Sequence, residues 1–278
     1  MHRRILFSGL LVATLLAACG TSPTTSPTPP STPATPEVRS ALAPTGTLRI
    51  AVYTGSPTSL VRAAPPAEMR GVSIDIGREL AQRLGVPSEV LVFQRVAEVV
   101  DALKAGRADF TITNATPARA ADVDFTDALV GLELGYLVLP GSPVSALDAV
   151  DRPGVRVGVS QGSTSQGVLT AQFKQASVVP APSLQAAREM LKSQQLDTFA
   201  TNKAVLFEMA DQLPGARVLA GRWGLERLAI AVPKGRGAAL PWLRGFAESV
   251  RRGGQVQQAA QRAGLRGTVD GAVGGTAP

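Results

Sequence analysis

The chain has almost none of two residues on which much enzyme chemistry depends. Only one of its 278 residues is a histidine and only one is a cysteine, and both lie near the start, at His2 and Cys19. Beyond them no imidazole or thiol remains, which excludes a Ser-His or Cys-His nucleophile and zinc held by histidine or cysteine. A disulfide framework is excluded too, so the fold must depend on its hydrophobic core.

Aromatic residues and long apolar runs are also scarce. Aromatics make up 4% of the chain, and the formal charge of +7 arises from interspersed signs with the basic excess toward the C-terminal end. A nucleic-acid-binding surface would show a basic stripe interleaved with aromatics, so we expect a solvated surface and no nucleic-acid partner. The longest apolar run, Ile5 to Leu16, is shorter than the ~20 residues of a membrane-spanning helix.

The first residues have the pattern of a secretory signal. A basic start, Met1 to Arg4, is followed by the apolar run and by small residues at Ala17 and Ala18, which predicts a signal peptide over residues 1–18. Leu16-Ala17-Ala18-Cys19 looks like a bacterial lipobox, in which acylated Cys19 becomes the first residue and anchors the protein. The alternative is an ordinary signal peptide with a chance cysteine. We expect an exported protein, lipid-anchored on the periplasmic or extracellular face of a membrane.

Two segments of simple composition flank the body of the chain. All residues from Thr21 to Pro36 except Ala34 are Thr, Ser or Pro. Such a segment has little apolar surface to bury and its prolines keep it extended, which predicts a tether over residues 19–45. Residues 267–278 are rich in Gly and Ala, which predicts a disordered tail.

Between these segments, short apolar strands alternate with amphipathic helices, which predicts an α/β fold. Residues 48–52 read as a strand, and residues 75–84 as a helix that Gly85 ends. A second helix lies around residues 96–103, with Gly106 after it, and residues 108–113 form the next strand.

Part of this pattern occurs twice. Residues 101–114 and 189–202 share Leu, Lys, Asp, Thr and Asn at a constant offset of 88, so that Asp109 matches Asp197 and Asn114 matches Asn202. A chance likeness of two helix-strand units is the alternative. The repeat predicts two similar lobes, in each of which a helix precedes a strand that ends in asparagine. Because ligands of open α/β sheets bind beyond the carboxyl ends of the strands, we expect both asparagines to face a cleft. Either could instead cap a helix.

Seven motifs follow one another in order along the body. They are Gly46-Thr47-Leu48-Arg49-Ile50-Ala51-Val52-Tyr53, Gly71-Val72-Ser73-Ile74-Asp75-Ile76, Ala105-Gly106-Arg107-Ala108-Asp109, Thr116-Pro117-Ala118-Arg119, Val123-Asp124-Phe125-Thr126-Asp127, Val157-Gly158-Val159-Ser160-Gln161-Gly162-Ser163-Thr164 and Ala229-Ile230-Ala231-Val232-Pro233-Lys234-Gly235. As an ordered set they resemble bacterial extracellular solute-binding proteins of family 3. The resemblance implies a two-lobed type II periplasmic-binding fold with a ligand cleft between the lobes, and service to an ABC importer.

The resemblance also implies site residues. Arg119 would pair with a ligand carboxylate through two parallel hydrogen bonds, beside Asn114 and Thr116. The alternative is a surface arginine paired with Asp122 or Asp124.

From the other lobe, Ser163 and Thr164 would place a helix N-terminus against an anion, or serve only as a loop and helix cap. Tyr53 would cap the ligand or pack within its strand, and Asn202 would contact the ligand or cap a helix.

Two positions depart from the usual family pattern. Many amino-acid binders have an aspartate at the Asn202 position, where it holds the α-ammonium, and a Pro-Tyr pair where this chain has Ala128-Leu129. The recognisable site groups are therefore one cation, one helix N-terminus and neutral amides, with no acid to meet an ammonium. We expect such a site to favour a small carboxylate or another polar ligand with little positive charge.

The predicted mechanism is capture by closure of two lobes. Residues 46–134 and 230–266 would form one lobe and residues 135–229 the other, with hinge crossings near Gly135 and Ala229. An amino-acid-like or carboxylate ligand, an ABC permease and a monomeric chain are expected, with no cofactor, metal or catalysis. The alternatives are an accessory or sensory module that docks on a partner protein and a dehydratase-like enzyme on the same fold.

Overall fold

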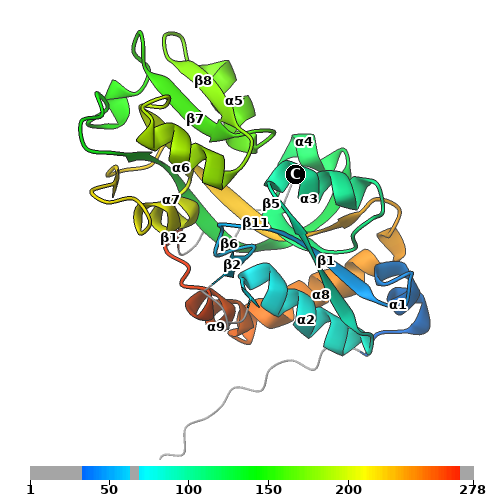
Figure 1. Cartoon of the computed structure of the whole chain (residues 1–278). Coiled ribbons are helices and arrows are strands. Elements are labelled where there is room, and N and C mark those ends of the chain that lie inside the picture. Colours follow the sequence, from blue (N-terminus) through cyan, green and yellow to red (C-terminus); the bar gives the residue numbers. More distant parts are fainter. Residues whose placement is uncertain (1–32, 63–68, 270–278) are drawn as a thin grey trace, which may run out of the picture.

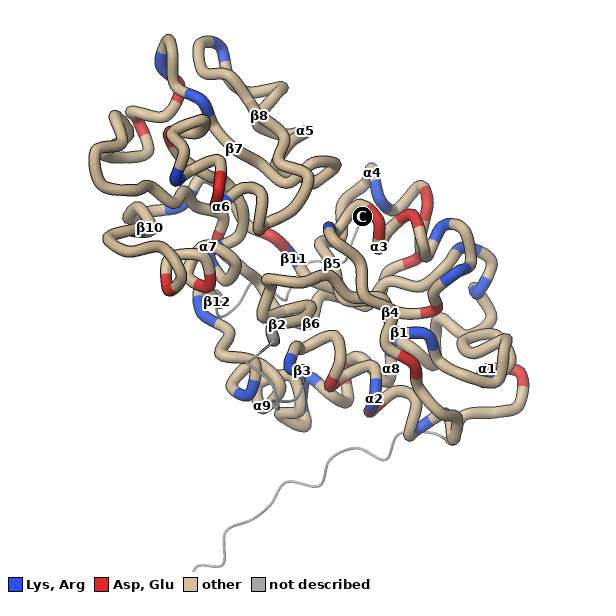
Figure 2. The backbone as a smooth tube through the Cα atoms, in the orientation of Figure 1, with Lys and Arg blue, Asp and Glu red and all other residues tan. Residues whose placement is uncertain are grey.

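The computed structural model describes residues 33–62 and 69–269, which form two lobes joined by long strands (Figure 1). The predicted signal peptide, Cys19 and the tether up to residue 32 lie outside the described residues. Within the described ranges, no helix is both long and apolar enough to cross a membrane. Lysine and arginine alternate with aspartate and glutamate along both lobes (Figure 2).

Lobe 1 is built on a sheet with helices on its faces. Strand β1 pairs in parallel with β4, and α2 and α3 both pack against β1. Its elements are α1 (Pro36–Leu42), β1 (Leu48–Tyr53), β2 (Val61–Arg62), β3 (Met69–Arg70), α2 (Val72–Leu84), β4 (Ser88–Phe93), α3 (Val96–Lys104), β5 (Thr111–Asn114), α4 (Pro117–Ala120), a 3-10 turn (Gly237–Ala239), α8 (Leu240–Arg252) and α9 (Gln255–Arg262).

The predicted helix of this lobe is confirmed with a small shift. It begins at Val72, three residues before the predicted start, and ends at Leu84. Ile76, Leu80 and Leu84 are buried on one face, as their spacing of four requires. Gly85 takes the left-handed conformation, with φ 67°, that ends many helices.

Lobe 2 has a parallel sheet in which β7 lies between β8 and β9. Helices α5, α6 and α7 pack against these strands. Its elements are a 3-10 turn (Leu147–Ala149), β7 (Arg156–Ser160), α5 (Thr164–Gln172), β8 (Ser177–Ala181), α6 (Leu184–Lys192), β9 (Thr198–Asn202), α7 (Lys203–Ala210) and β10 (Arg217–Val218).

Two long antiparallel strands, β6 (Val123–Val138) and β11 (Gly224–Pro233), pass from one lobe to the other. Strand β11 pairs with β5 in lobe 1, and β6 pairs with β9 in lobe 2. The pairing of β11 with β6 shifts register next to Ala229, close to one of the two predicted crossings. Residues in the middle of these strands therefore lie where the lobes meet.

The structure corrects both ends of the predicted body. Residues 36–42 form α1 within the predicted tether, and Leu42 is only 1% exposed. The Nη1 atom of Arg236 donates to the carbonyl of Leu42 over 2.9 Å, which fixes α1 to lobe 1. At the other end Thr268–Val269 forms β12, which pairs with β6. Thr35, the N-cap of α1, gives the helix a local start that the Thr/Ser/Pro composition concealed.

The sequence repeat corresponds to a repeated structure. In lobe 1, the Nε and Nη2 atoms of Arg49 donate to the carboxylate of Asp109, both over 2.8 Å. In lobe 2, the same atoms of Arg156 donate to Asp197 over 3.0 and 2.7 Å. Each aspartate also accepts the backbone N–H of its arginine. In each lobe the helix of the repeat leads to a strand that ends in asparagine, Asn114 in β5 and Asn202 in β9.

Candidate functional site

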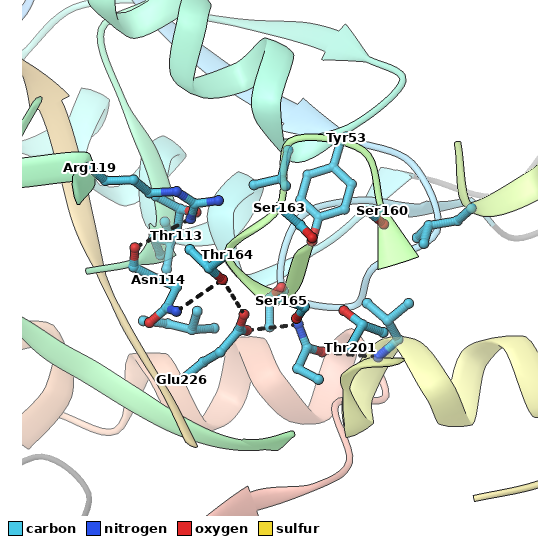
Figure 3. Close-up of a pocket in the computed structure, with 17 residues that line it drawn as sticks. Tyr53, Thr113, Asn114, Arg119, Ser160, Ser163, Thr164, Ser165, Thr201 and Glu226 are labelled. Carbon is cyan, nitrogen blue, oxygen red and sulfur yellow. Dashed lines mark hydrogen bonds between the residues drawn. The ribbon is translucent and has the colours of Figure 1, made fainter. Parts of the chain in front are cut away.

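A cavity lies between the lobes, where β5, β9 and β11 converge with the start of α5 (Figure 3). Figure 3 shows Arg119, Thr113 and Asn114 at one side, Tyr53 and Ser160 at the other, and Glu226 below Thr164. The residues that line it are Tyr53, Thr58, Val96, Ile112, Thr113, Asn114, Arg119, Ser160, Ser163, Thr164, Ser165, Leu184, Thr201, Asn202, Val205, Glu226 and Leu228.

Arg119 supplies the positive charge of the cavity. It stands on the short helix α4, where Thr116 accepts the N–H of Arg119 as N-cap. The Nη1 atom of Arg119 donates to Thr113 Oγ1 over 2.7 Å and to the carbonyl of Asn114 over 3.3 Å. In the described structure its Nε and Nη2 atoms donate to no protein group, so two donors remain for a ligand. Burial lowers the pKa of Arg119, and the negative charge of Glu226 opposes that shift.

The alternative of a surface arginine paired with a nearby aspartate is wrong. Asp122 pairs with Lys104 over 2.7 Å, and Asp124 pairs with Lys234 over 2.7 Å. Both acids are therefore engaged by lysines, while the guanidinium of Arg119 turns toward the cavity.

Glu226 supplies a negative charge that the sequence interpretation missed. This residue of β11 is 7% exposed and lines the same cavity as Arg119. Asn202 Nδ2 donates to Glu226 Oε2 over 2.9 Å, and Thr164 Oγ1 lies 3.5 Å from Oε1. Burial raises the pKa of Glu226, against the opposing effects of Arg119, Asn202 and Thr164. The expectation that no acid could meet an ammonium is therefore wrong.

The pattern of β11 did contain a signal for Glu226. Successive side chains of a strand point to opposite faces, so residues 226, 228, 230 and 232 share one. Leu228, Ile230 and Val232 are all buried, and Glu226 continues that row, whereas Leu225 is 38% exposed. A charged residue in line with a buried apolar row indicates either a structural ion pair or a site.

The two repeated asparagines both reach the cavity, by different means. Asn202 accepts the N–H of Val205 through Oδ1, as N-cap of α7, and turns its Nδ2 to Glu226. The helix-cap role is therefore confirmed, and the other end of the amide faces Glu226 in the cavity. Asn114 caps no helix: its Oδ1 accepts the N–H of Arg227, and its Nδ2 lies 3.4 Å from Thr164 Oγ1 across the cleft.

The predicted helix N-terminus of lobe 2 is α5, and it points into the cleft. Ser163 is its N-cap and accepts the N–H of Gln166 over 3.2 Å. Thr164 is the first helical residue and faces Asn114 and Glu226. Both residues line the cavity, where the positive end of the helix dipole would favour an anionic group.

The remaining two predicted site residues differ in their placement. Tyr53 lines the cavity and also packs against the apolar clusters of both lobes, so packing and ligand contact are compatible. Burial raises the pKa of its hydroxyl, which stays neutral. Thr116 lies outside the cavity. It caps α4 and lines a neighbouring groove, so its position supports Arg119 from behind.

The lobes are in close contact around the cavity. A Cβ built on Gly162 of lobe 2 would lie 2.7 Å from the Cβ of Ala97 in lobe 1. A Cβ on Gly55 of lobe 1 would lie 3.0 Å from Cδ1 of Leu184 in lobe 2. A Cβ at residue 162 would require the backbone of one lobe to shift, whereas the flexible Leu184 side chain could turn away from a Cβ at residue 55. The lobes therefore touch on both sides of the cavity, as expected of a closed two-lobed protein.

The chemistry of the cavity is that of a binding site with two opposite charges. Arg119 and Glu226 influence each other's pKa, yet no ion pair within 4.0 Å joins these two described residues. Their separation leaves space for a molecule with an anionic and a cationic end. Among the described residues, no group of three or more His, Cys, Asp or Glu side chains could hold a metal ion.

Known proteins resemble this chain in both sequence and structure. The ABC transporter glutamine-binding protein of Bacillus subtilis (strain 168) is 25% identical over 233 residues, which cover 82% of this chain and 84% of that protein. The solute receptor for L-cysteine of Neisseria gonorrhoeae superposes with a TM-score of 0.72 at 24% identity, covering 81% of this chain and 92% of the receptor.

An ancestral amino-acid-binding protein, described as a precursor of cyclohexadienyl dehydratase, superposes with a TM-score of 0.69 at 22% identity. The match covers 80% of this chain and 97% of the ancestral protein. These structural likenesses confirm the type II periplasmic-binding fold. Residues 48–264 match the family of bacterial extracellular solute-binding proteins, family 3, and the chain belongs to that family.

Proposed function

We propose that this chain is the substrate-binding component of an ABC importer and that it captures an α-amino acid as a zwitterion. The observation that carries the proposal is the presence of one basic residue, Arg119, and one acidic residue, Glu226, in a single cavity. Arg119 would hold the α-carboxylate through its two remaining donors, with Thr164 at the start of α5 beside it. Glu226 would accept hydrogen bonds from the α-ammonium.

This proposal revises the expectation of a simple anion. A carboxylate without an ammonium would satisfy Arg119 but would leave Glu226 buried opposite a second negative charge, which is costly. A zwitterion places a positive charge beside Glu226 and a negative charge beside Arg119. The amino-acid binders among the similar proteins are consistent with this assignment.

Closure of the lobes would couple binding to transport. The ligand contacts come from both lobes and from β11, so a bound amino acid stabilises the closed form over the open one. A permease that recognises the closed form would then receive a loaded protein. Attachment to a membrane through Cys19 would keep the binding protein near that permease.

A series of alanine analogues tests both ends of the site. We expect L-alanine to raise the melting temperature of the purified chain through mass action, whereas propionate and ethylamine, which each lack one charge, give no shift. R119A should abolish the shift, because a desolvated charge pair is worth at least about 2 kcal/mol. R217A, a change on the edge strand β10, is the control and should bind normally.

The outcomes separate the rival functions. Tight binding of propionate or a dicarboxylate, with no binding of amino acids, would show that the site takes simple anions. Conversion of the ligand into a product during incubation, followed by mass spectrometry, would favour the enzyme alternative. Import of labelled amino acid by cells that depends on this chain and its permease would distinguish transport from an accessory or sensory role.

A further inference from the structure

The cavity that holds Arg119 and Glu226 is small. Its volume is about 30 Å³, whereas one water molecule needs ~10–15 Å³ by the same measure. Space for about two or three water molecules suits a ligand with a short side chain and not one with a long side chain.

Contacts between the lobes set this size. Leu184 of lobe 2 is 5% exposed, lines the cavity and closes against Gly55 of lobe 1. Tyr53 packs against the apolar cluster that contains Leu184. On the other side Gly162 meets Ala97. Enlarging the cavity for a longer ligand would separate these contacts and lose the closed form.

The walls beyond the charged pair are neutral. Apart from Arg119 and Glu226, every lining residue is apolar or carries a hydroxyl or an amide. No second carboxylate is available among them for the cationic end of a lysine or arginine side chain. Ser160 and Thr201 present hydroxyls that pair with no group in the described ranges, and these suit a ligand hydroxyl or thiol.

A larger groove nearby does not extend the cavity. It has a volume of about 580 Å³ and is lined by Trp223 and by two residues on the face of β11 opposite Glu226, Leu225 and Arg227. Asn114 and Thr164 line both spaces, and Nδ2 of Asn114 lies 3.4 Å from Oγ1 of Thr164. A long ligand side chain would have to break that contact to reach the groove.

We infer that the site is specific for small neutral α-amino acids of the size of alanine, serine and cysteine, and that it excludes glutamine, lysine and arginine. The inference rests on the proposed function, because it assumes that Arg119 and Glu226 hold the two charges of the ligand backbone. Size and the neutrality of the walls then select the side chain.

Calorimetry with a panel of amino acids tests the inference. The full chain is unfolded and refolded to remove any ligand carried through purification, then titrated with L-alanine, L-serine, L-cysteine, L-glutamine, L-lysine and L-arginine. We expect the three small amino acids to bind at least about 100-fold more tightly than the three large ones. Tighter binding of glutamine, lysine or arginine would overturn the inference and leave the proposed function intact. Failure of all six to bind would overturn the proposed function itself.

A variant of the wall gives a second, independent test. L184A removes the side chain that closes the cavity, so the ratio of the Kd for L-leucine to the Kd for L-alanine should fall at least about tenfold. L169A is the control, because Leu169 is also buried in lobe 2, at 1% exposed against 5% for Leu184, but lies outside the cavity. An unchanged ratio in L184A, or the same change in L169A, would contradict the assignment of Leu184 as the size-limiting residue.

Discussion

Asn202 donates a hydrogen bond from Nδ2 to Glu226 Oε2 over 2.9 Å, while its Oδ1 accepts the N–H of Val205 over 3.1 Å. The second bond fixes the orientation of the amide, so a donor must face Glu226. An aspartate at this position would instead present a carboxylate to a carboxylate. The neutral Asn202 at the end of β9 therefore complements the acidic Glu226 on β11. In this site the acidic group lies on β11 and not on β9.

A charge-exchange pair of variants tests this arrangement. E226Q should weaken amino-acid binding at least about 30-fold, because the α-ammonium loses its buried partner. N202D alone should also weaken binding, since two adjacent carboxylates raise each other's pKa. The double variant N202D/E226Q restores a single negative charge on β9 and should bind more tightly than E226Q. Calorimetry on the four proteins measures this coupling, and a double variant no better than E226Q would contradict it.

Ligand binding should depend on pH through Glu226. Burial raises the pKa of this carboxyl above its ordinary value, and only the ionised form neutralises an ammonium. Affinity should therefore be constant above the raised pKa and should fall as pH drops below it, approaching tenfold per pH unit. The charges of the ligand backbone change little between about pH 4.5 and pH 7, so calorimetry in that range reports the protein. E226Q should show no such dependence, and an equal dependence in E226Q would exclude Glu226 as its source.

The same pKa shift predicts the stability of the protein without ligand. Folding raises the pKa of this carboxyl, so its protonated form favours the folded state. This contribution to stability is fully present below the pKa that the carboxyl has in the unfolded chain. It is lost as pH rises through the higher pKa that the carboxyl has in the folded protein. Above the raised pKa the ionised Glu226 therefore destabilises the empty protein, and at such pH values E226Q should melt at an equal or higher temperature than the wild type. Thermal unfolding without ligand measures this, and a large fall in the melting temperature would show that Glu226 is a structural residue.

The repeated arginine-aspartate pairs should differ in their effect on stability. The Asp109 side chain is 0% exposed and also accepts from Arg236 over 2.7 Å, whereas the Asp197 side chain is 13% exposed beside an Arg156 side chain that is 42% exposed. D109A leaves two arginines without a buried partner and should cost about 3–5 kcal/mol. D197A leaves an arginine that water can reach and should cost much less. Urea unfolding of both variants measures the difference, and equal losses would contradict it.

These residues also show how far the sequence could predict the structure. The offset of 88 identified Asp109 and Asp197 as equivalent, and the structure gives them the same hydrogen bonds. The difference in their burial depends on Arg236, 127 residues away from Asp109, which no local pattern reveals. Arg119 was predicted because its motif is contiguous. Glu226 was missed because its position in the cavity depends on the path of β11 between the lobes and on closure.

Closure itself can be tested at the contact between Gly162 and Ala97. Gly162 and Gly154 both have positive φ, 72° and 82°, so an alanine strains the backbone similarly at either position. A Cβ at residue 162 would lie 2.7 Å from the Cβ of Ala97, whereas one at residue 154 has no atom within 4 Å. G162A should therefore hold the lobes apart, and G154A should not.

We expect G162A to bind amino acids at least about tenfold more weakly than G154A, and its radius of gyration in small-angle X-ray scattering to stay unchanged when ligand is added. Adding A97G to G162A removes the clashing methyl group and should restore both affinity and compaction, at a cost of about 1 kcal/mol to the helix that contains residue 97. Because A97G acts from the opposite lobe and lies outside the cavity lining, its rescue can arise only through the contact between lobes. If G162A binds as tightly as G154A, closure at this contact is not required for capture.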